Sequence, residues 1–221
     1  MNNNALAYNA WYETPRGAWI GDTEYSQIRR LLNIRAGGKI LDVGCGTGYF
    51  SRQLARDGFS VSGVDNNIEM IDVACARRVG DERYMLGDAD ALPFKDNEFD
   101  CAIAITSLCF VPQQARALAE MRRVSKQKVL LGVLNRHSLL YLKKGLGNRQ
   151  GAYRGARWYD LSELYVLFAA AGLKVEHVSS AVFFPQGGRL SRCMERVIPN
   201  VVPLGGILFA SADVGKCLEA R

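Results

Sequence analysis

Short apolar runs alternate with amphipathic stretches from residue 39 to residue 134, and no other feature of the sequence restricts the fold as strongly. The apolar runs predict strands at 39–43, 60–64, 83–86, 99–105 and 128–134, and the stretches between them predict helices at 49–56, 68–77 and 113–124. Strands that are apolar along their whole length are typical of a parallel sheet buried on both faces. We therefore expect an α/β fold: a Rossmann-like, doubly wound sheet with helices on both faces.

The segments on either side of this core are predicted to complete the sheet. A helix over 22–32, capped by Asp22 or Thr23, precedes the first strand. After residue 135 the pattern predicts a glycine-rich loop, a helix at 159–171, a strand at 173–184, a helix at 189–197 and a strand at 207–214. The last two strands indicate an antiparallel hairpin that ends a mostly parallel sheet of seven strands.

The chain of 221 residues fits one large domain with three parts. These are an N-terminal aromatic lid with the first helix (1–38), a cofactor-binding core (39–135), and a basic loop with the C-terminal completion of the sheet (136–221). We expect all three parts to share a single domain.

Composition excludes several protein classes. Hydrophobic residues make up 48% of the chain, which is a globular composition, and no apolar run reaches the roughly 18 residues of a membrane span. The first residues lack the basic and apolar regions of a signal peptide. The six cysteines form no Cys-x-x-Cys pair and lie far in sequence from the two histidines. This pattern indicates reduced thiols, a cytoplasmic protein and no metal site.

The net charge of +6 is concentrated in one segment. Ten Lys or Arg and no Asp or Glu occur between Arg122 and Arg157. Such a segment is typical of a solvated surface, but it also attracts anions. Three alternatives stay open: a surface without a partner, a site for an anionic small molecule, and an interface for nucleic acid or an anionic membrane.

The first predicted strand runs directly into a glycine-rich turn, ILDVGCGTGYF at 40–50. In a doubly wound sheet the ligand binds beyond the carboxyl ends of the strands, where the strand order reverses, and this turn borders that place. Gly44, Gly46 and Gly48 follow the spacing G-x-G-x-G, which differs from the G-x-G-x-x-G of dinucleotide-binding folds. The Lys-Ser/Thr pair of a phosphate-binding loop is missing. A tight strand–helix connection without a ligand is the alternative.

Two acidic residues are predicted to lie at the same edge of the sheet. Asp65 follows the second strand, and its carboxylate can accept hydrogen bonds from both hydroxyls of a ribose or can cap the next helix. Asp88 follows the third strand in GDADALPF. There it and the backbone N–H of Ala89 can bind the amine and a ring nitrogen of adenine, or Asp88 can form a loop turn.

In this order and at these spacings, the motifs resemble those of the class I S-adenosylmethionine-dependent methyltransferases, type 11 group. ILDVGCGTG resembles the first motif of the family, GDADALPF its adenine-binding loop, and FDCAIAITSLCFVP with ALAEMRRVS its fourth strand and next helix. The resemblance covers residues 39 to about 135 strongly. The chain departs from the family by lacking a Pro-Gly-Gly turn before the fifth strand, where it reads RRVSKQKVLL. We expect this change to shorten or reshape a loop far from the cofactor.

The resemblance implies S-adenosylmethionine as the cofactor and assigns it a set of contacts. The implied residues are Asp42, which either orients the turn or holds the ammonium group directly or through water; Gly44, Cys45, Gly46 and Gly48 against the methionine portion; Asp65 and Asn66 at the ribose; Asp88 and Ala89 at the adenine; and Ile105 and Thr106 near the sulfonium. The ligand is cationic at sulfur and at the ammonium group, so three carboxylates at this edge suit it better than they suit a phosphate.

Methyl transfer from a sulfonium requires alignment and, when the acceptor must lose a proton, a base. On the acceptor side, Tyr8, Trp11 and Tyr12 are expected to close over the site as a lid, or else to pack on the surface of the sheet. Asn135 and His137 follow the fifth strand. A neutral His137 is a candidate general base, and a solvated loop residue is the alternative.

We predict a methyltransferase that acts on a small-molecule acceptor, which is anionic if the basic segment faces the site. The Asp/Asn-Pro-Pro-Tyr/Phe stretch that serves planar amines is missing after the fourth strand, where the chain reads TSLCF. The alternatives are an RNA methyltransferase that uses the basic segment and a regulatory protein that binds the cofactor without chemistry. The sequence predicts neither the methylated atom nor the oligomeric state.

Overall fold

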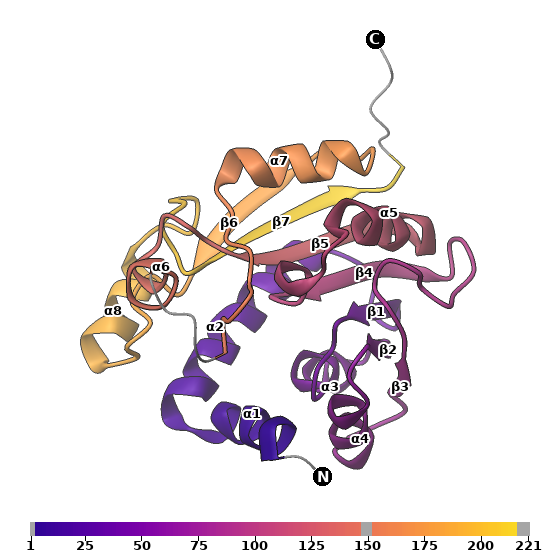
Figure 1. Ribbon diagram of the computed structural model, residues 1–221, viewed down its shortest axis with the longest axis horizontal. Helices are drawn as coiled ribbons and strands as arrows, with labels where there is room; N and C mark the ends of the chain where they lie inside the picture. The colour runs from indigo at the N-terminus through magenta and orange to yellow at the C-terminus, as the bar shows by residue number, and fades with distance from the viewer. Residues whose placement is uncertain (1–2, 147–151, 216–221) are drawn as a thin grey trace.

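A twisted sheet of seven strands runs through the molecule (Figure 1). The computed structural model describes residues 3–146 and 152–215. The strands are β1 (Lys39–Val43), β2 (Ser60–Asp65), β3 (Arg83–Leu86), β4 (Phe99–Ile105), β5 (Ser125–Leu134), β6 (His177–Ala181) and β7 (Ile207–Asp213). Their order in the sheet is β3-β2-β1-β4-β5-β7-β6, and β7 is antiparallel to both of its neighbours. The predicted fold class, with its antiparallel terminal pair, is confirmed.

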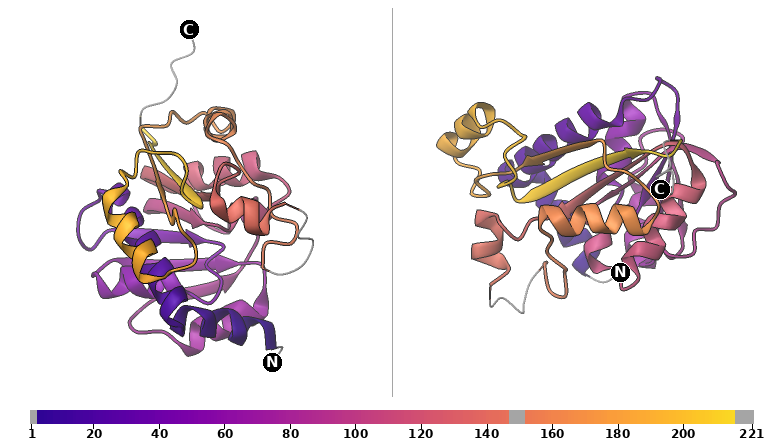
Figure 2. Two further views of the ribbon diagram at one scale, coloured as in Figure 1. Left: turned by 90° about the vertical axis from the view of Figure 1, so that its left-hand side faces the viewer. Right: turned by 90° about the horizontal axis from the view of Figure 1, so that it is seen from above.

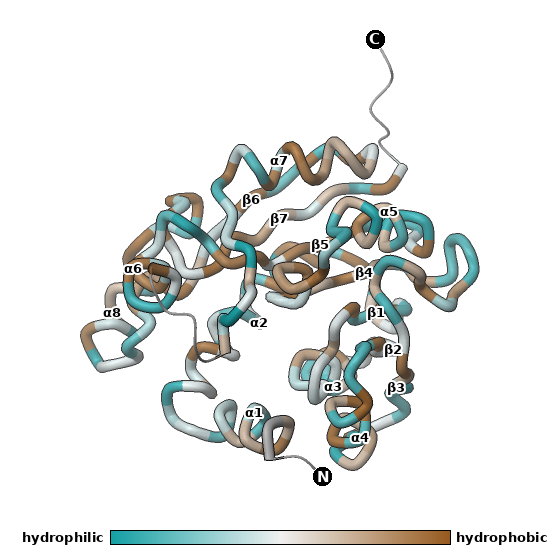
Figure 3. The backbone as a smooth tube through the Cα atoms, viewed as in Figure 1, coloured by the Kyte–Doolittle hydropathy of each residue, from teal (hydrophilic) through white to brown (hydrophobic). Residues whose placement is uncertain are grey.

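Helices cover both faces of the sheet. They are α1 (Asn3–Glu13), α2 (Pro15–Leu32), α3 (Tyr49–Arg56), α4 (Ile68–Ala76), the 3₁₀ turn η1 (Leu108–Phe110), α5 (Gln114–Val124), α6 (Leu139–Lys144), α7 (Leu161–Ala170) and α8 (Arg189–Val197). Helices α5 and α7 lie above the sheet in Figure 1, and α2 and α3 lie below it. Each pair buries its apolar side chains in a separate core on its own face. Apolar stretches, brown in Figure 3, follow the central strands, as burial on both faces requires.

The helix predicted to begin at Asp22 begins seven residues earlier, so that expectation was wrong. Helix α2 starts at Pro15, and the side chain of Thr14 caps it by accepting a hydrogen bond from the Gly17 backbone N–H at 3.0 Å. Gly17 and Gly21 look like helix breakers in the sequence. They are needed inside the helix because a Cβ at Gly21 would lie 2.5 Å from the Tyr49 hydroxyl, and one at Gly17 would overlap the Trp11 carbonyl.

Three other local expectations change. Strand β5 begins at Ser125, directly after α5, so the missing Pro-Gly-Gly turn leaves no loop at that junction. The strand predicted at 173–184 is reduced to β6, which ends where Val182 adopts a left-handed backbone with φ of 64°. The loop predicted after residue 135 contains the short helix α6, capped by the Ser138 side chain.

The strand order reverses between β2 and β4, on the two sides of β1. Because these strands are parallel, the residues that follow β1, β2, β3 and β4 all lie at one edge of the sheet. Helix α8 follows β6 at this same edge, because β6 runs parallel to β5, and it projects from the sheet with none of its residues buried (Figure 2).

Within the described ranges, no helix is long and apolar enough to cross a membrane. The same part of the chain contains no group of three or more His, Cys, Asp or Glu side chains arranged to hold a metal ion.

Candidate cofactor and acceptor site

The glycine turn adopts a backbone that only glycine tolerates well. Gly44, Gly46 and Gly48 have φ values of 70°, 53° and 75°, all in the left-handed region. A Cβ at Gly44 would lie 2.3 Å from the Cβ of Ser107, and one at Gly48 would lie 2.6 Å from the Tyr84 hydroxyl. Close packing explains two of the glycines. At Gly46 the nearest atom to such a Cβ is Tyr8 Cε1 at 3.7 Å, so this part of the turn has space beside it.

Asp65 ties the turn to the start of the next helix. One carboxylate oxygen accepts a hydrogen bond from the Gly46 backbone N–H at 2.8 Å, and the other accepts from the Asn67 N–H at 2.9 Å. The cap of α4 is Asn67, whose side chain accepts from the Glu69 N–H, so Asp65 is not the capping residue. A carboxylate has about four acceptor positions, so Asp65 can also accept hydrogen bonds from a ligand.

Asp42 is buried behind the turn, with 2% of its surface exposed. The Ser51 hydroxyl donates a 2.6 Å hydrogen bond to it. Burial raises the pKa of Asp42 to about 6; the Ser51 bond opposes this rise, and the charge of Asp65 adds to it. In the part of the chain that the structure describes, neither carboxylate has an ion pair with a basic side chain.

The remaining predicted cofactor residues surround the same edge of the sheet. Asn66 and Asp88 are exposed, whereas Ala89 is half-buried. Ile105 ends β4 with its side chain in the core. Thr106 follows it with a left-handed φ of 55° and donates its backbone N–H to the Gly132 carbonyl at 2.7 Å. Buried Cys45 completes the set, and burial raises the pKa of its thiol.

This donor set fits S-adenosylmethionine. Asp42 and Asp65 present carboxylates without a basic partner among the described residues, which suits the ammonium and sulfonium charges of the ligand. A phosphate group would instead meet two like charges. In this fit, Asp65 would hold the ribose and the glycine turn the methionine portion. The cofactor, when bound, supplies a methyl group as an electrophile.

Helix α1 lies across the turn and is fixed there by contacts at several points. Tyr12 stacks on Tyr49 with ring centroids 3.8 Å apart and planes 14° apart. The Arg52 guanidinium donates to the side-chain oxygen of Asn9 at 3.3 Å, and Arg77 forms a 2.7 Å ion pair with Glu13. Of the predicted acceptor-side residues, Tyr8 lies beside Gly46, Tyr12 is buried, and Trp11 packs edge-on against Tyr12.

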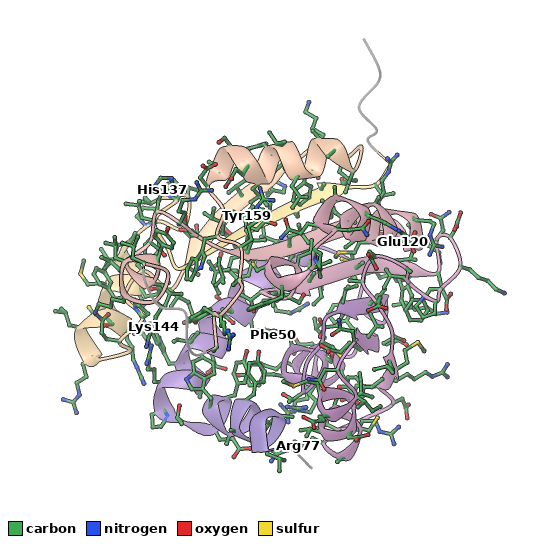
Figure 4. All side chains as sticks on the ribbon, viewed as in Figure 1. Phe50, Arg77, Glu120, His137, Lys144 and Tyr159 are labelled. Carbon is green, nitrogen blue, oxygen red and sulfur yellow. The ribbon has the colours of Figure 1, made fainter. Side chains whose placement is uncertain are left out.

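Asn135 and His137 do not join this group. Asn135 is fully buried and its amide donates to the Pro203 and Gly205 carbonyls while accepting the His137 backbone N–H, so its side chain holds loops together. His137 is exposed and lies near Asp160 at the start of α7, and Figure 4 shows it at the upper left, apart from the more central Phe50, which adjoins the glycine turn. We therefore do not assign it the role of a base.

Three residues of this region are missing from the sequence-based predictions. Ser107 packs against Gly44 and donates its hydroxyl to the Val43 carbonyl at 2.7 Å. Glu24 and Tyr153 come from α2 and from the loop before α7. Glu24 had a detectable signal, because it occupies the same helical face as Ile20 and Ile28, four residues away on each side.

Comparison with known proteins agrees with this geometry. Residues 41–132 match the family described as "Methyltransferase domain". An uncharacterised protein of Mycobacterium tuberculosis is 32% identical over 180 residues, which are 78% of this chain and 59% of that protein. A demethylmenaquinone methyltransferase of Renibacterium salmoninarum is 42% identical over 90 residues, or 41% of this chain and 38% of that enzyme. The chain thus spans less than two thirds of the length of these relatives.

A crystal structure from Thermotoga maritima has the same fold with a TM-score of 0.76 and 26% identity. The match covers 94% of this chain and 95% of the Thermotoga chain. That structure is described as an S-adenosylmethionine-dependent methyltransferase, possible histamine N-methyltransferase.

The strand order, the acid-lined glycine turn and these matches identify residues 41–132 as a methyltransferase domain with the class I fold. This domain belongs to the type 11 group of S-adenosylmethionine-dependent methyltransferases, and S-adenosylmethionine is the cofactor of this family. The family, fold and cofactor predictions are therefore confirmed. The individual contact residues stay predictions.

Proposed function

We propose that this protein transfers a methyl group from S-adenosylmethionine to a small-molecule acceptor. One observation carries the proposal: α1 lies over the glycine turn with Tyr8 within van der Waals distance of the position that a Gly46 Cβ would occupy. A site covered by a helix gives room to a small molecule and excludes water from the reaction. The Renibacterium relative is named for a small-molecule acceptor, demethylmenaquinone.

The surroundings of the basic segment favour a small molecule over RNA. Acids from outside the segment pair with four of its ten basic residues: Arg123 lies 2.7 Å from Glu120 and 2.8 Å from Asp96, and Lys128 lies 3.3 Å from Asp213. Arg136 and Arg157 both pair with Glu163, and Arg122 donates to the Ala171 carbonyl at 3.0 Å. Charges that are already paired contribute little to binding phosphates.

The charges at the glycine turn also weigh against an anionic acceptor. At the glycine turn the carboxylates of Asp42 and Asp65 repel anions, and the guanidinium of Arg52 is engaged by the Thr47 carbonyl and the Asn9 side chain. We therefore propose an acceptor that is neutral or cationic.

Calorimetry tests the cofactor half of the proposal. The purified protein should bind S-adenosylmethionine or S-adenosylhomocysteine and should bind NAD much more weakly. The acceptor half is tested with cofactor labelled in its methyl group, incubated with a small-molecule extract and separately with total RNA. We expect the label in the small-molecule fraction; label recovered in RNA would contradict the proposal.

A further inference from the structure

Helix α2 carries a buried carboxyl group without a partner. Glu24 is only 6% exposed, and it has no hydrogen bond or ion pair among the described residues. It stands on the face of α2 that also buries Ile20 and Ile28. Burial raises the pKa of Glu24 from its ordinary 4.5 to about 8, and no basic side chain offsets this effect. Burying a carboxyl group without a partner costs free energy, and titratable groups in such surroundings cluster at functional sites.

Four tyrosines from three other parts of the chain lie in the neighbourhood of Glu24. Tyr8 and Tyr12 come from α1, with their hydroxyls 3.3 Å apart. Tyr49 stacks on Tyr12, and its hydroxyl reaches Gly21, one helical turn before Glu24. Tyr153 comes from the loop before α7.

The electrostatics link these rings to Glu24. Burial raises the pKa of Tyr153 to about 12, and the charge of Glu24 is the next largest cause. Glu24 also raises the pKa of Tyr8, Tyr12 and Tyr49, in each case after burial. Two cations have the opposite effect: Arg16 lowers the pKa of Tyr153, and Arg52 lowers the pKa of Tyr49.

A buried carboxyl with several aromatic rings nearby can bind an organic cation, because a carboxylate attracts positive charge and so does a ring face that is free to meet it. The group lies next to the glycine turn, since Tyr8 contacts the position of a Gly46 Cβ. We propose that Glu24 binds the methyl acceptor, that the acceptor is an aliphatic amine on an apolar or aromatic framework, and that Glu24 takes the proton this amine must lose. The inference rests on the proposed methyl transfer and names its substrate class.

The proton step balances within the site. An aliphatic amine enters as an ammonium ion, whose nitrogen has no free electron pair. One N–H bond breaks with its electron pair left on nitrogen, and an O–H bond forms on the Glu24 carboxylate, so the ion pair becomes a neutral amine beside a neutral acid. Burial favours this exchange because both charges disappear. The amine then has the electron pair that methylation requires, and Glu24 keeps its proton after the product leaves and gives it up to water when the next ammonium ion binds.

The test uses the protein saturated with S-adenosylhomocysteine and three probes: the phenyl, indolyl and imidazolyl ethylamines, each matched with its alcohol. In calorimetry we expect at least one amine to bind at least about tenfold more tightly than its alcohol. Measured in two buffers of different ionisation enthalpy at pH 7, that amine should release about 0.9 proton, because Glu24 gives up the proton that a pKa near 8 leaves on it. Both readings use the unaltered protein.

Two variants locate the effect. E24Q should bind S-adenosylhomocysteine as the parent does but lose both the amine preference and the proton release. D22N removes a charge from an exposed position on the same helix and should keep both. Equal binding of every amine and its alcohol, or an unchanged amine preference in E24Q, overturns the inference. Failure of the parent to bind S-adenosylhomocysteine is a different result and overturns the proposed function instead.

Discussion

Acidic side chains near the glycine turn and basic side chains between Arg122 and Arg157 differ in how their charges are balanced. Asp42 receives one hydroxyl bond, Asp65 two backbone bonds and Glu24 none, and no basic side chain in the described ranges pairs with them. In the basic segment, by contrast, Glu120, Asp96, Asp213 and Glu163 provide counter-charges.

The difference teaches that local charge density is a poor guide to the site. The segment with ten basic residues is more prominent in the sequence, yet four of these residues form ion pairs with acids from outside the segment. The three carboxyls are scattered over positions 24, 42 and 65, and they remain without counter-charge. Buried acids without a counter-charge cost stability, and a protein retains such acids where function requires them.

The largest expected effect concerns stability and pH. Glu24 has a folded pKa of about 8, above its ordinary 4.5, so its contribution to stability is complete below pH 4.5 and is lost as the pH rises through 8. At about 1.4 kcal/mol per pH unit, the loss is of the order of 5 kcal/mol. Replacing Glu24 by Gln should remove this slope.

Urea unfolding of the parent and of E24Q at pH 5, 7 and 9 measures this pH-dependent loss of stability. The gap between the two free energies of unfolding should grow with pH in favour of E24Q. D22N is the control, and it should follow the parent. A constant gap at all three pH values would show that the Glu24 carboxyl has an ordinary pKa, and the contrast between the two charged regions would weaken.

The second prediction compares two left-handed glycines. Gly44 in the turn has Ser107 within 2.3 Å of a new Cβ, whereas Gly58 on the outside has nothing within 4 Å. Backbone strain alone should make G58A less stable by about 1 kcal/mol. Overpacking against Ser107 adds to the strain in G44A, for a total of about 3 kcal/mol. Thermal or urea unfolding measures both, and equal losses would mean that Ser107 moves aside freely.

The third prediction concerns cofactor affinity. Removing the Asp65 carboxylate in D65A deprives the ribose hydroxyls of a charged acceptor, which costs about 1.5–3 kcal/mol, or roughly ten- to more than a hundredfold in affinity for S-adenosylhomocysteine. D72A on the exposed side of α4 is the matched control and should bind as the parent does. If D65A retains the parent's affinity, Asp65 serves only to hold the Gly46 and Asn67 backbones.

The smallest effect is expected at the basic segment. Replacing Lys144 and Arg154, which line a surface pocket with Tyr141 and Trp158, should change cofactor affinity by less than about 0.5 kcal/mol. RNA should bind the parent only weakly at physiological salt. Submicromolar RNA affinity that falls with salt at a slope near −3.5, the value for about five phosphate contacts on a single strand, would reverse the comparison and restore the RNA methyltransferase.

Local pattern accounts for most of the fold. Strands β1, β3 and β4 have the predicted bounds, because each is a short apolar run whose signal lies within the segment itself. The start of α2 was missed for the opposite reason. Glycines such as Gly17 and Gly21 disfavour a helix in the sequence. Only the close packing of Trp11 and Tyr49 against these two positions explains why glycine is needed inside the helix.

The sequence by itself determined the cofactor edge of the site. Once the strands are parallel, Asp42, Asp65 and Asp88 must lie at the carboxyl ends of neighbouring strands, and motif spacing identifies the family. Tertiary structure alone decided the acceptor side and the fate of the basic segment. Lys128 meets Asp213 85 positions later, and Glu24 meets Tyr153 across most of the chain. Such partners are set by how helices and loops pack over the sheet, and no local periodicity records that packing.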